Sequence, residues 1–199
     1  VRRAAGHEVR AVHDGARAGP GARAGRGVDG VSIPAVPGVY RGVLFRSNLE
    51  RQWARAFDGM LGEARGGPRW IYEPPPHRPD FELFDTDGKP WIIVEIKNDA
   101  FDIEHSPVHR FTSIAKKTGR SVFLLAGNCW PGQYSVFVFS ADGARIINEG
   151  AWRECRGCGY VSIFGIGGKC RNCIGIEVDA FTDRIVEAFD AASKLRART

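Results

Sequence analysis

The chain has 199 residues, enough for one domain of moderate size and a small appendage. Hydrophobic residues make up 43% and charged residues 26% of it, which is ordinary for a globular protein, and no apolar run reaches the ~20 residues of a membrane-spanning helix. We therefore expect no membrane partner. The net charge of +5 favours a polyanionic partner such as nucleic acid.

The first 38 residues are rich in Ala, Gly and Arg, with few bulky apolar side chains and no sustained periodicity. Such a composition buries too little apolar surface to fold by itself, so we interpret residues 1–38 as a flexible arm. Two interpretations of its arginines stay open: a solvated tail, or contacts with a nucleic-acid backbone.

A helix is predicted from Ser47 onward, because Ser47 and Glu50 have the spacing of a capping box. Glycines at positions 62, 66 and 67 end this helix. Glu50 has two candidate roles: it either completes the cap or points toward an acidic site further along the chain. The apolar stripe of the helix consists of Leu49, Trp53, Ala56, Phe57, Met60 and Leu61.

Two apolar segments, 81–84 and 91–97, flank a glycine-containing turn, which predicts a β-hairpin. Because side chains alternate along a strand, Glu95 and Lys97 lie on one face of the second segment. Asp80 stands at the start of the first strand, so the hairpin brings it back to Glu95 and Lys97. We expect two carboxylates and one ammonium to meet at one edge of a sheet.

This group of charges points to a particular chemistry. Two close carboxylates repel each other and are costly to bury unless a cation lies between them. Oxygen ligands with open positions suit Mg²⁺ or Mn²⁺, which complete their shells with water and substrate phosphate. An ammonium beside such an ion can orient the attacking water and offset the charge that develops on the phosphate. The pattern therefore predicts metal-assisted phosphodiester hydrolysis.

The order of the remaining elements indicates the fold class. A strand, a helix and a strand in succession imply that 91–97 and 121–126 pair in parallel, with a right-handed crossover. The predicted fold is α/β, a mixed sheet flanked by helices, in a core of residues 39–150. Its elements outside the hairpin are a strand at 70–73, a helix from Ser106-Pro107 to Gly119, and strands at 121–126 and 134–140.

Four of the five cysteines form two C-x-x-C pairs that are eleven residues apart, a spacing typical of a tetrathiolate Zn²⁺ site in a zinc ribbon. Segment 161–164 and the glycines after it predict a small hairpin between the two pairs. Four protein ligands close the site, so we expect a structural metal. The neighbouring basic residues leave DNA contact and simple stabilisation open. The zinc ligands would be Cys155, Cys158, Cys170 and Cys173, and the basic residues are Arg153, Arg156, Lys169 and Arg171.

The fifth cysteine, Cys129, has no partner in this pattern, and an odd thiol beside a metal site favours a reducing, cytoplasmic compartment. We assign the zinc ribbon to residues 151–177 and a C-terminal helical segment to 178–199. The helix itself is predicted from Ala180 to Arg198, with Asp179 as its cap. Its apolar stripe is Phe181, Ile185, Val186, Phe189, Ala192 and Leu195.

Pro79-Asp80, followed by Glu95-Ile96-Lys97 at the end of an apolar strand, resembles the signature of the PD-(D/E)xK nuclease superfamily. The segment 45–54 is similar to the helix that precedes this signature in many members. The resemblance covers about residues 44–140. It implies a restriction-endonuclease-like core and a Mg²⁺- or Mn²⁺-dependent DNA endonuclease.

The same resemblance implies a role for each site residue. Asp80 and Glu95, aided by the carbonyl group of Ile96, would hold Mg²⁺. Lys97 would orient the water and offset charge, and Glu50 would be the extra acidic residue that the upstream helix usually carries. DNA is the implied partner, and paired cuts would need a homodimer. The sequence contains no P-loop, so we expect no nucleotide cofactor.

One alternative belongs to a different functional class. The chain would then be a non-catalytic nucleic-acid-binding or assembly subunit that retains the nuclease fold and the zinc ribbon. The complete set of Asp80, Glu95 and Lys97 argues against this alternative, because a decayed nuclease usually loses one of the three.

Overall fold

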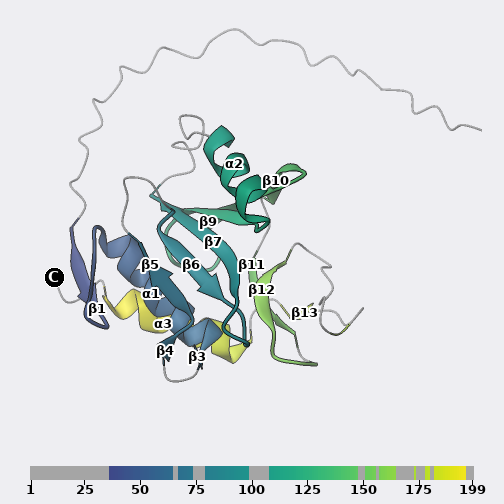
Figure 1. Cartoon of the computed structure of the whole chain (residues 1–199). Helices are drawn as coiled ribbons and strands as arrows, with labels where there is room; N and C mark the ends of the chain where they lie inside the picture. The colour runs from purple at the N-terminus through teal and green to yellow at the C-terminus, as the bar shows by residue number, and fades with distance from the viewer. Residues whose placement is uncertain are drawn as a thin grey trace, which may run out of the picture. The chain divides into compact units, whose positions relative to one another are not determined.

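The computed structural model describes residues 36–64, 67–73, 79–98, 108–147, 151–155, 157–164, 173, 178–179 and 182–195 (Figure 1). The expected arm lies almost wholly outside these ranges, although Gly38 at its end already belongs to a strand. The elements are β1 Gly38–Tyr40, β2 Val43–Phe45, α1 Asn48–Leu61, β3 Glu63–Ala64, β4 Gly67–Pro68, β5 Trp70–Tyr72, β6 Phe81–Phe84, β7 Pro90–Lys97, α2 Val108–Thr118, β8 Val122–Gly127, β9 Tyr134–Ser140, β10 Gly143–Ile147, β11 Ala151–Cys155, β12 Val161–Phe164, β13 Val178–Asp179 and α3 Asp183–Ser193.

The central sheet contains six strands in the order β10-β9-β8-β7-β6-β5. β7 and β8 run parallel, and the other four neighbouring pairs are antiparallel. Both the hairpin and the parallel pair predicted from the sequence are therefore confirmed, and the fold is α/β with a mixed sheet. The connection from β7 to β8 passes through 99–107, outside the described residues, so its handedness stays a prediction.

The turn between β6 and β7, together with a register shift beside it, sets the register of the hairpin. Asp85 Oδ1 accepts the backbone N–H groups of Asp87 and Lys89, each at 2.9 Å, and Gly88 adopts a φ of 76°, which glycine tolerates best. The turn pairs Phe84 with Pro90, and a register shift of one residue between Leu83 and Phe84 then places Phe81 opposite Val94. The next position along this antiparallel pair places Asp80 opposite Glu95.

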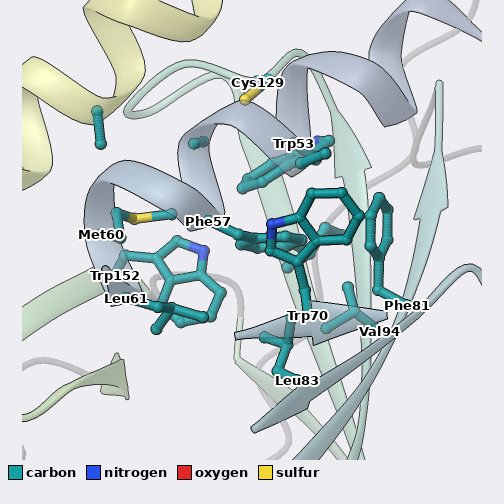
Figure 2. Packing of buried hydrophobic residues seen from close by; sticks show 14 of the residues in the cluster. Trp53, Phe57, Met60, Leu61, Trp70, Phe81, Leu83, Val94, Cys129 and Trp152 are labelled. Atoms are coloured by element: carbon teal, nitrogen blue, oxygen red, sulfur yellow. The ribbon is translucent and has the colours of Figure 1, made fainter. Parts of the chain in front are cut away.

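Side chains of β7 alternate between two separate hydrophobic cores. Ile92, Val94 and Ile96 join the larger core, which α1 covers with Trp53, Phe57, Met60 and Leu61 (Figure 2). Ile93 faces the other way and packs with Phe111 and Ala115 of α2. The predicted alternation is thus confirmed. The β7 side chains that join the core under α1 lie on one face of the sheet, and Glu95 and Lys97 lie on the other.

Helix α1 begins with the capping box expected from the sequence. The N–H of Glu50 donates to Ser47 Oγ at 3.1 Å, and the N–H of Ser47 donates back to Glu50 Oε2 at 3.2 Å. The helix ends before Gly62, whose φ of 70° suits glycine. Its predicted apolar stripe is buried except for the partly buried Leu49.

Helix α3 starts later than predicted. It begins at Asp183 after Thr182, whereas the sequence pattern placed its start at Ala180. The reason is that Asp179, the expected cap, pairs with Glu154 as part of β13. Ile185, Phe189 and Ala192 are buried as predicted, but Val186 is exposed and does not belong to the stripe.

A second, three-stranded sheet has the order β12-β11-β13. Segment 161–164 forms β12 and pairs with β11, which ends at the first cysteine of the two pairs, Cys155. The glycines of the expected hairpin, at positions 165, 167 and 168, lie outside the described residues. Trp152 of β11 is fully buried, with its ring centroid 5.7 Å from that of Phe57, so this sheet shares the core under α1. Across the described ranges, no helix is both long and apolar enough to cross a membrane.

Candidate active site and metal centre

Asp80 lies immediately before β6 and is fully buried. Its Oδ2 accepts the backbone N–H of Ile96 from β7 at 2.8 Å. This bond ties the start of one hairpin strand to the far end of the other and fixes the direction of the carboxylate. The predicted approach of Asp80 to the end of β7 is thus present in the structure.

Glu95 and Lys97 occupy the same face of β7. Lys97 Nζ lies 3.0 Å from Glu95 Oε1, while only 8% of the Glu95 side chain is exposed. The second oxygen of Glu95, Oε2, is buried and has no hydrogen-bond partner among the described residues. An unsatisfied buried carboxylate oxygen is energetically costly, and a bound cation would remove that cost.

Glu50 reaches the same edge of the sheet from the first turn of α1. Besides closing the cap, it accepts a hydrogen bond from Tyr72 Oη at 2.7 Å and one from Arg46 Nη2 at 3.0 Å. The same Arg46 nitrogen lies 2.6 Å from Asp80 Oδ1. Capping and pointing toward the acidic site are therefore not exclusive, because Glu50 does both through different oxygens.

Electrostatics at Asp80 reflect this crowding. Burial, then repulsion from the Glu95 and Glu50 carboxylates, raise the pKa of Asp80 to about 7, although the Ile96 N–H and the Arg46 guanidinium pull it down. For Arg46, partial burial lowers the pKa, but Tyr72, Glu50 and Asp80 outweigh this and raise it overall. The site holds more negative charge than its own cations neutralise.

The exposure of these groups gives the site a direction. The carboxylates are inside, with 7% of the Glu50 side chain and 1% of the Asp80 side chain exposed, whereas 49% of Arg46 and 34% of Lys97 are exposed. Two cations therefore flank the acidic interior on its solvent side. An approaching anion would meet them first.

A cavity of about 320 Å³ opens between β6, β7 and the C-terminal half of α2. Pro79 and Ile93 line it, so its rim adjoins Asp80 on the side of the sheet that α2 covers. Lys117 and Arg120 supply positive charge at its wall, and Arg120 pairs there with Glu82. Asp80, Glu95 and Lys97 themselves do not line this cavity.

Carboxylate oxygens are the ligands that a hard divalent cation prefers, and binding of such an ion by Asp80 and Glu95 stays a prediction. Carboxylate oxygens of Asp80 and Glu95 come from adjacent strands, and Glu95 Oε2 lacks any other partner in the described part of the chain. Glu50 contributes negative charge to Asp80 but is held by Tyr72 and Arg46. Ile96 N–H binds Asp80, and a metal-ligating role for its carbonyl stays a prediction.

The cysteine cluster is more compact than the acidic one. The sulfur atoms of Cys155, Cys158 and Cys173 all lie within 4.8 Å of one another, and no other described residues bring three such ligands this close. Neighbouring Cys158, burial and Cys155 raise the pKa of the Cys173 thiol to about 12. These three thiols could hold a metal ion such as zinc. The expected fourth ligand, Cys170, lies outside the described residues.

The knuckle around Cys155 has the expected backbone geometry. The N–H of Cys155 donates to Tyr160 O at 2.9 Å, and the N–H of Gly159 donates to Cys155 O at 2.8 Å. Gly159 has a φ of 67°, so the glycine after the first pair permits the turn. Of the basic residues expected nearby, only Arg153 falls within the described ranges.

Two residues of the acidic site escaped the sequence reasoning. Arg46 links Glu50 to Asp80, and Tyr72 donates to Glu50 from β5. Arg46 directly precedes Ser47, which forms a capping box with Glu50, and this position was its signal in the sequence. Tyr72 gave no signal, since only its pairing with Phe81 brings it to the site.

Comparisons with known proteins identify no relative of this chain. No protein-family model matches the chain, and neither the curated proteins nor the solved structures contain a match.

Proposed function

We propose that this protein is a metal-dependent DNA endonuclease that hydrolyses phosphodiester bonds at the Asp80–Glu95–Lys97 edge of a restriction-endonuclease-like core. The observation that carries the proposal is the orphaned, buried Oε2 of Glu95 next to Asp80, whose pKa is raised to about 7. A pair of buried carboxylates with too little positive charge is what a divalent-cation site requires.

Charge balance explains how such a site would attract its substrate. When all are ionised, the three carboxylates carry −3, and Arg46 and Lys97 carry +2. Without a metal ion the site therefore has a net charge of −1 and would weakly repel a phosphodiester. A bound Mg²⁺ or Mn²⁺ would make the sum +1 and would polarise the phosphate and lower the pKa of bound water. Substrate binding and metal binding should therefore reinforce each other.

The residues of the chain would divide the remaining work. Asp80 and Glu95 would bind the ion. Glu50, next to Arg46, would add negative charge to the site. Lys97 projects toward solvent from the same strand as Glu95, so its ammonium group could orient the attacking water or stabilise charge on the phosphate oxygens. Arg46, half exposed, could contact a neighbouring phosphate.

The ribbon supports a separate, structural metal in this proposal. Cys155, Cys158 and Cys173 would bind Zn²⁺ together with Cys170, and four sulfur ligands would leave no open position for substrate. The zinc would hold β12 and β13 against β11 and would take no part in hydrolysis.

One observation favours the second candidate, a non-catalytic nucleic-acid-binding subunit. Both oxygens of Asp80 already have donors, Arg46 Nη2 at 2.6 Å and the Ile96 N–H at 2.8 Å. If the guanidinium group of Arg46 takes the place of a metal ion, the acidic site would be stable but would not catalyse hydrolysis. Binding of DNA without cleavage in any divalent metal would decide for this candidate.

The decisive experiment is DNA cleavage with Mg²⁺ or Mn²⁺ on linear, nicked, branched and single-stranded substrates. Asp80→Asn, Glu95→Gln and Lys97→Ala should each lower the rate by about 100-fold or more. Glu187→Gln and Lys116→Ala are matched controls, because they remove the same charges at exposed positions of α3 and α2 outside the site. Equal cleavage by the wild type and all five variants would refute the assignment.

A further inference from the structure

A small polar pocket lies at the turn between β8 and β9. It has a volume of about 230 Å³ and is lined by Gln52 of α1, Ser193 of α3 and four residues of the turn. This volume is below the ~300–1,000 Å³ of pockets that hold drug-sized ligands, so a single flat ring system is a better match than a whole nucleotide. The turn residues are Asn128, Cys129, Trp130 and Gln133.

Gln52 is the observation that points to a ligand. Its side chain is on the wall of the pocket, only 3% of the residue is exposed, and its amide has no hydrogen-bond partner among the described residues. A buried amide carries one acceptor and two donors, and leaving them unpaired is costly. Such a group is retained at a site where something else supplies the partner.

The turn presents further groups in a fixed geometry. The N–H of Asn128 donates to Gln133 O at 2.9 Å, and the N–H of Gln133 donates to Trp130 O at 3.0 Å. Gly127, with a φ of 120°, permits this closure, since a Cβ there would lie 2.3 Å from Gln133 O. Figure 2 shows Cys129 of this turn beside α1.

The chemistry of the lining is that of base recognition. Trp130 is 37% exposed and offers an indole face, and base–indole stacking does not depend on base identity. The amides of Gln52, Asn128 and Gln133 can pair with the donor and acceptor edges of a base. The Asn128 and Gln133 side chains meet each other at only 3.4 Å, a weak bond that a ligand could replace.

The pocket lies at the same sheet edge as the acidic site. β7 and β8 are parallel, and Lys97 pairs with Ala126, so Asn128 follows two residues beyond that level, about 7 Å along the strand direction. Gln52 belongs to the same helix as Glu50, two residues further on. Residues two apart on a helix point to different sides of it, so proximity rests on the parallel pairing of β7 with β8, which places the turn and the acidic site at the same end of the sheet. A DNA strand crossing that end would pass both places.

We propose that this pocket, formed by Gln52, Trp130 and the amides of the β8–β9 turn, binds one unpaired nucleobase of a DNA strand whose backbone lies at the acidic site. The inference rests on the proposed function for the presence of DNA. It adds that the protein prefers DNA with an unstacked base near the cut, over continuous duplex.

The test uses the full chain carrying Asp80→Asn, so that DNA is bound and not cut. Fluorescence anisotropy would compare a labelled single-stranded oligodeoxynucleotide with an abasic strand of equal length, which keeps every phosphate. Because an abasic strand has no base to stack on Trp130, it should bind roughly 5- to 100-fold more weakly. Adding Trp130→Ala should abolish this difference, and Trp130→Phe should keep most of it. Gln52→Met, equal in length, should reduce it.

Affinity for the abasic strand is the internal control, because it should not change among these variants. If Trp130→Ala weakens both strands equally, Trp130 is only structural and the proposal fails. It fails equally if the two strands bind alike to the Asp80→Asn protein. If binding depends on the base but the wild type does not cleave DNA, the proposal for the pocket stands and only the nuclease assignment is overturned. Absence of all DNA binding would overturn both.

Discussion

Arg46 Nη2 lies 2.6 Å from Oδ1 of Asp80, and the same nitrogen lies 3.0 Å from Oε1 of Glu50. One guanidinium thus joins the first turn of α1 to the start of β6, two elements that are separated in the sequence by β3, β4 and β5. The acidic site is held together by this cation before any metal is considered.

Removal of that cation should destabilise the fold. Arg46→Ala leaves Asp80 and Glu50 buried without their shared partner, and because half of the arginine side chain is exposed, we expect a loss of about 1–3 kcal/mol in the free energy of unfolding. Urea titration would measure it. Lys194→Ala is the control, since its exposed pair with Asp190 should contribute under about 0.5 kcal/mol. Added Mg²⁺ should stabilise Arg46→Ala more than the wild type, and an equal response of the two would contradict a cation site at Asp80.

Stability should also depend on pH in a defined direction. The pKa of Asp80 is about 7 in the folded chain and 3.8 ordinarily, so the folded state binds this proton more tightly than the unfolded state. The contribution of Asp80 is then fully present below pH 3.8 and is lost as the pH rises through about 7. In zinc-loaded protein without Mg²⁺, the wild type should lose stability between pH 5 and pH 8 relative to Asp80→Asn. Mg²⁺ should restore it at pH 8 and have little effect at pH 5, because the ion competes with the proton.

The cysteine cluster predicts one tightly bound zinc ion per chain. Cys155→Ser and Cys173→Ser should lose the metal, as measured by elemental analysis of the purified protein, and should lower the melting temperature. Cys170→Ser tests the fourth ligand. Cys129→Ala is the matched control, a buried cysteine in the β8–β9 turn that should keep the zinc. Full metal content in Cys155→Ser would exclude the tetrathiolate site.

Close packing of α1 on α3 gives a further prediction. A Cβ at Gly59 would lie 2.5 Å from the Cβ of Ala188, so Gly59→Ala should destabilise the protein by about 1–3 kcal/mol. Ala188→Gly in the same chain removes that Cβ and so relieves part of the clash, while the Ala188 Cα at 2.8 Å remains. The double variant should therefore be more stable than the sum of the two single changes implies, and simple additivity in urea titrations would argue against this helix contact.

Local patterns were readable from the sequence where neighbours in the chain decide the structure. The Ser47–Glu50 cap, the Asp85 turn and the alternation along β7 each depend on a few consecutive residues, and all three led to the observed geometry. The hairpin itself followed from the turn, which is why Asp80 and the end of β7 could be placed together, but the register shift between Leu83 and Phe84 that puts Asp80 opposite Glu95 left no signal in the sequence.

Features that depend on distant segments were missed or misplaced. Asp179 looked like a helix cap because the sequence does not reveal that Glu154 pairs with it. Tyr72 is an ordinary strand residue until the pairing of β5 with β6 brings it to Glu50. The short strands β1 and β2 have three residues each, too few for an alternation to be recognised.

The burial of Trp152 has a consequence for how the molecule is put together. Its indole fills space beneath Phe57, yet it belongs to the strand that leads into the cysteine knuckle. A version of the chain shortened to its first 150 residues would leave an open hole under α1 and expose aromatic surface to water. The predicted ribbon segment 151–177 is thus not detachable as a whole, because its first strand, β11, supplies a side chain that the core under α1 needs.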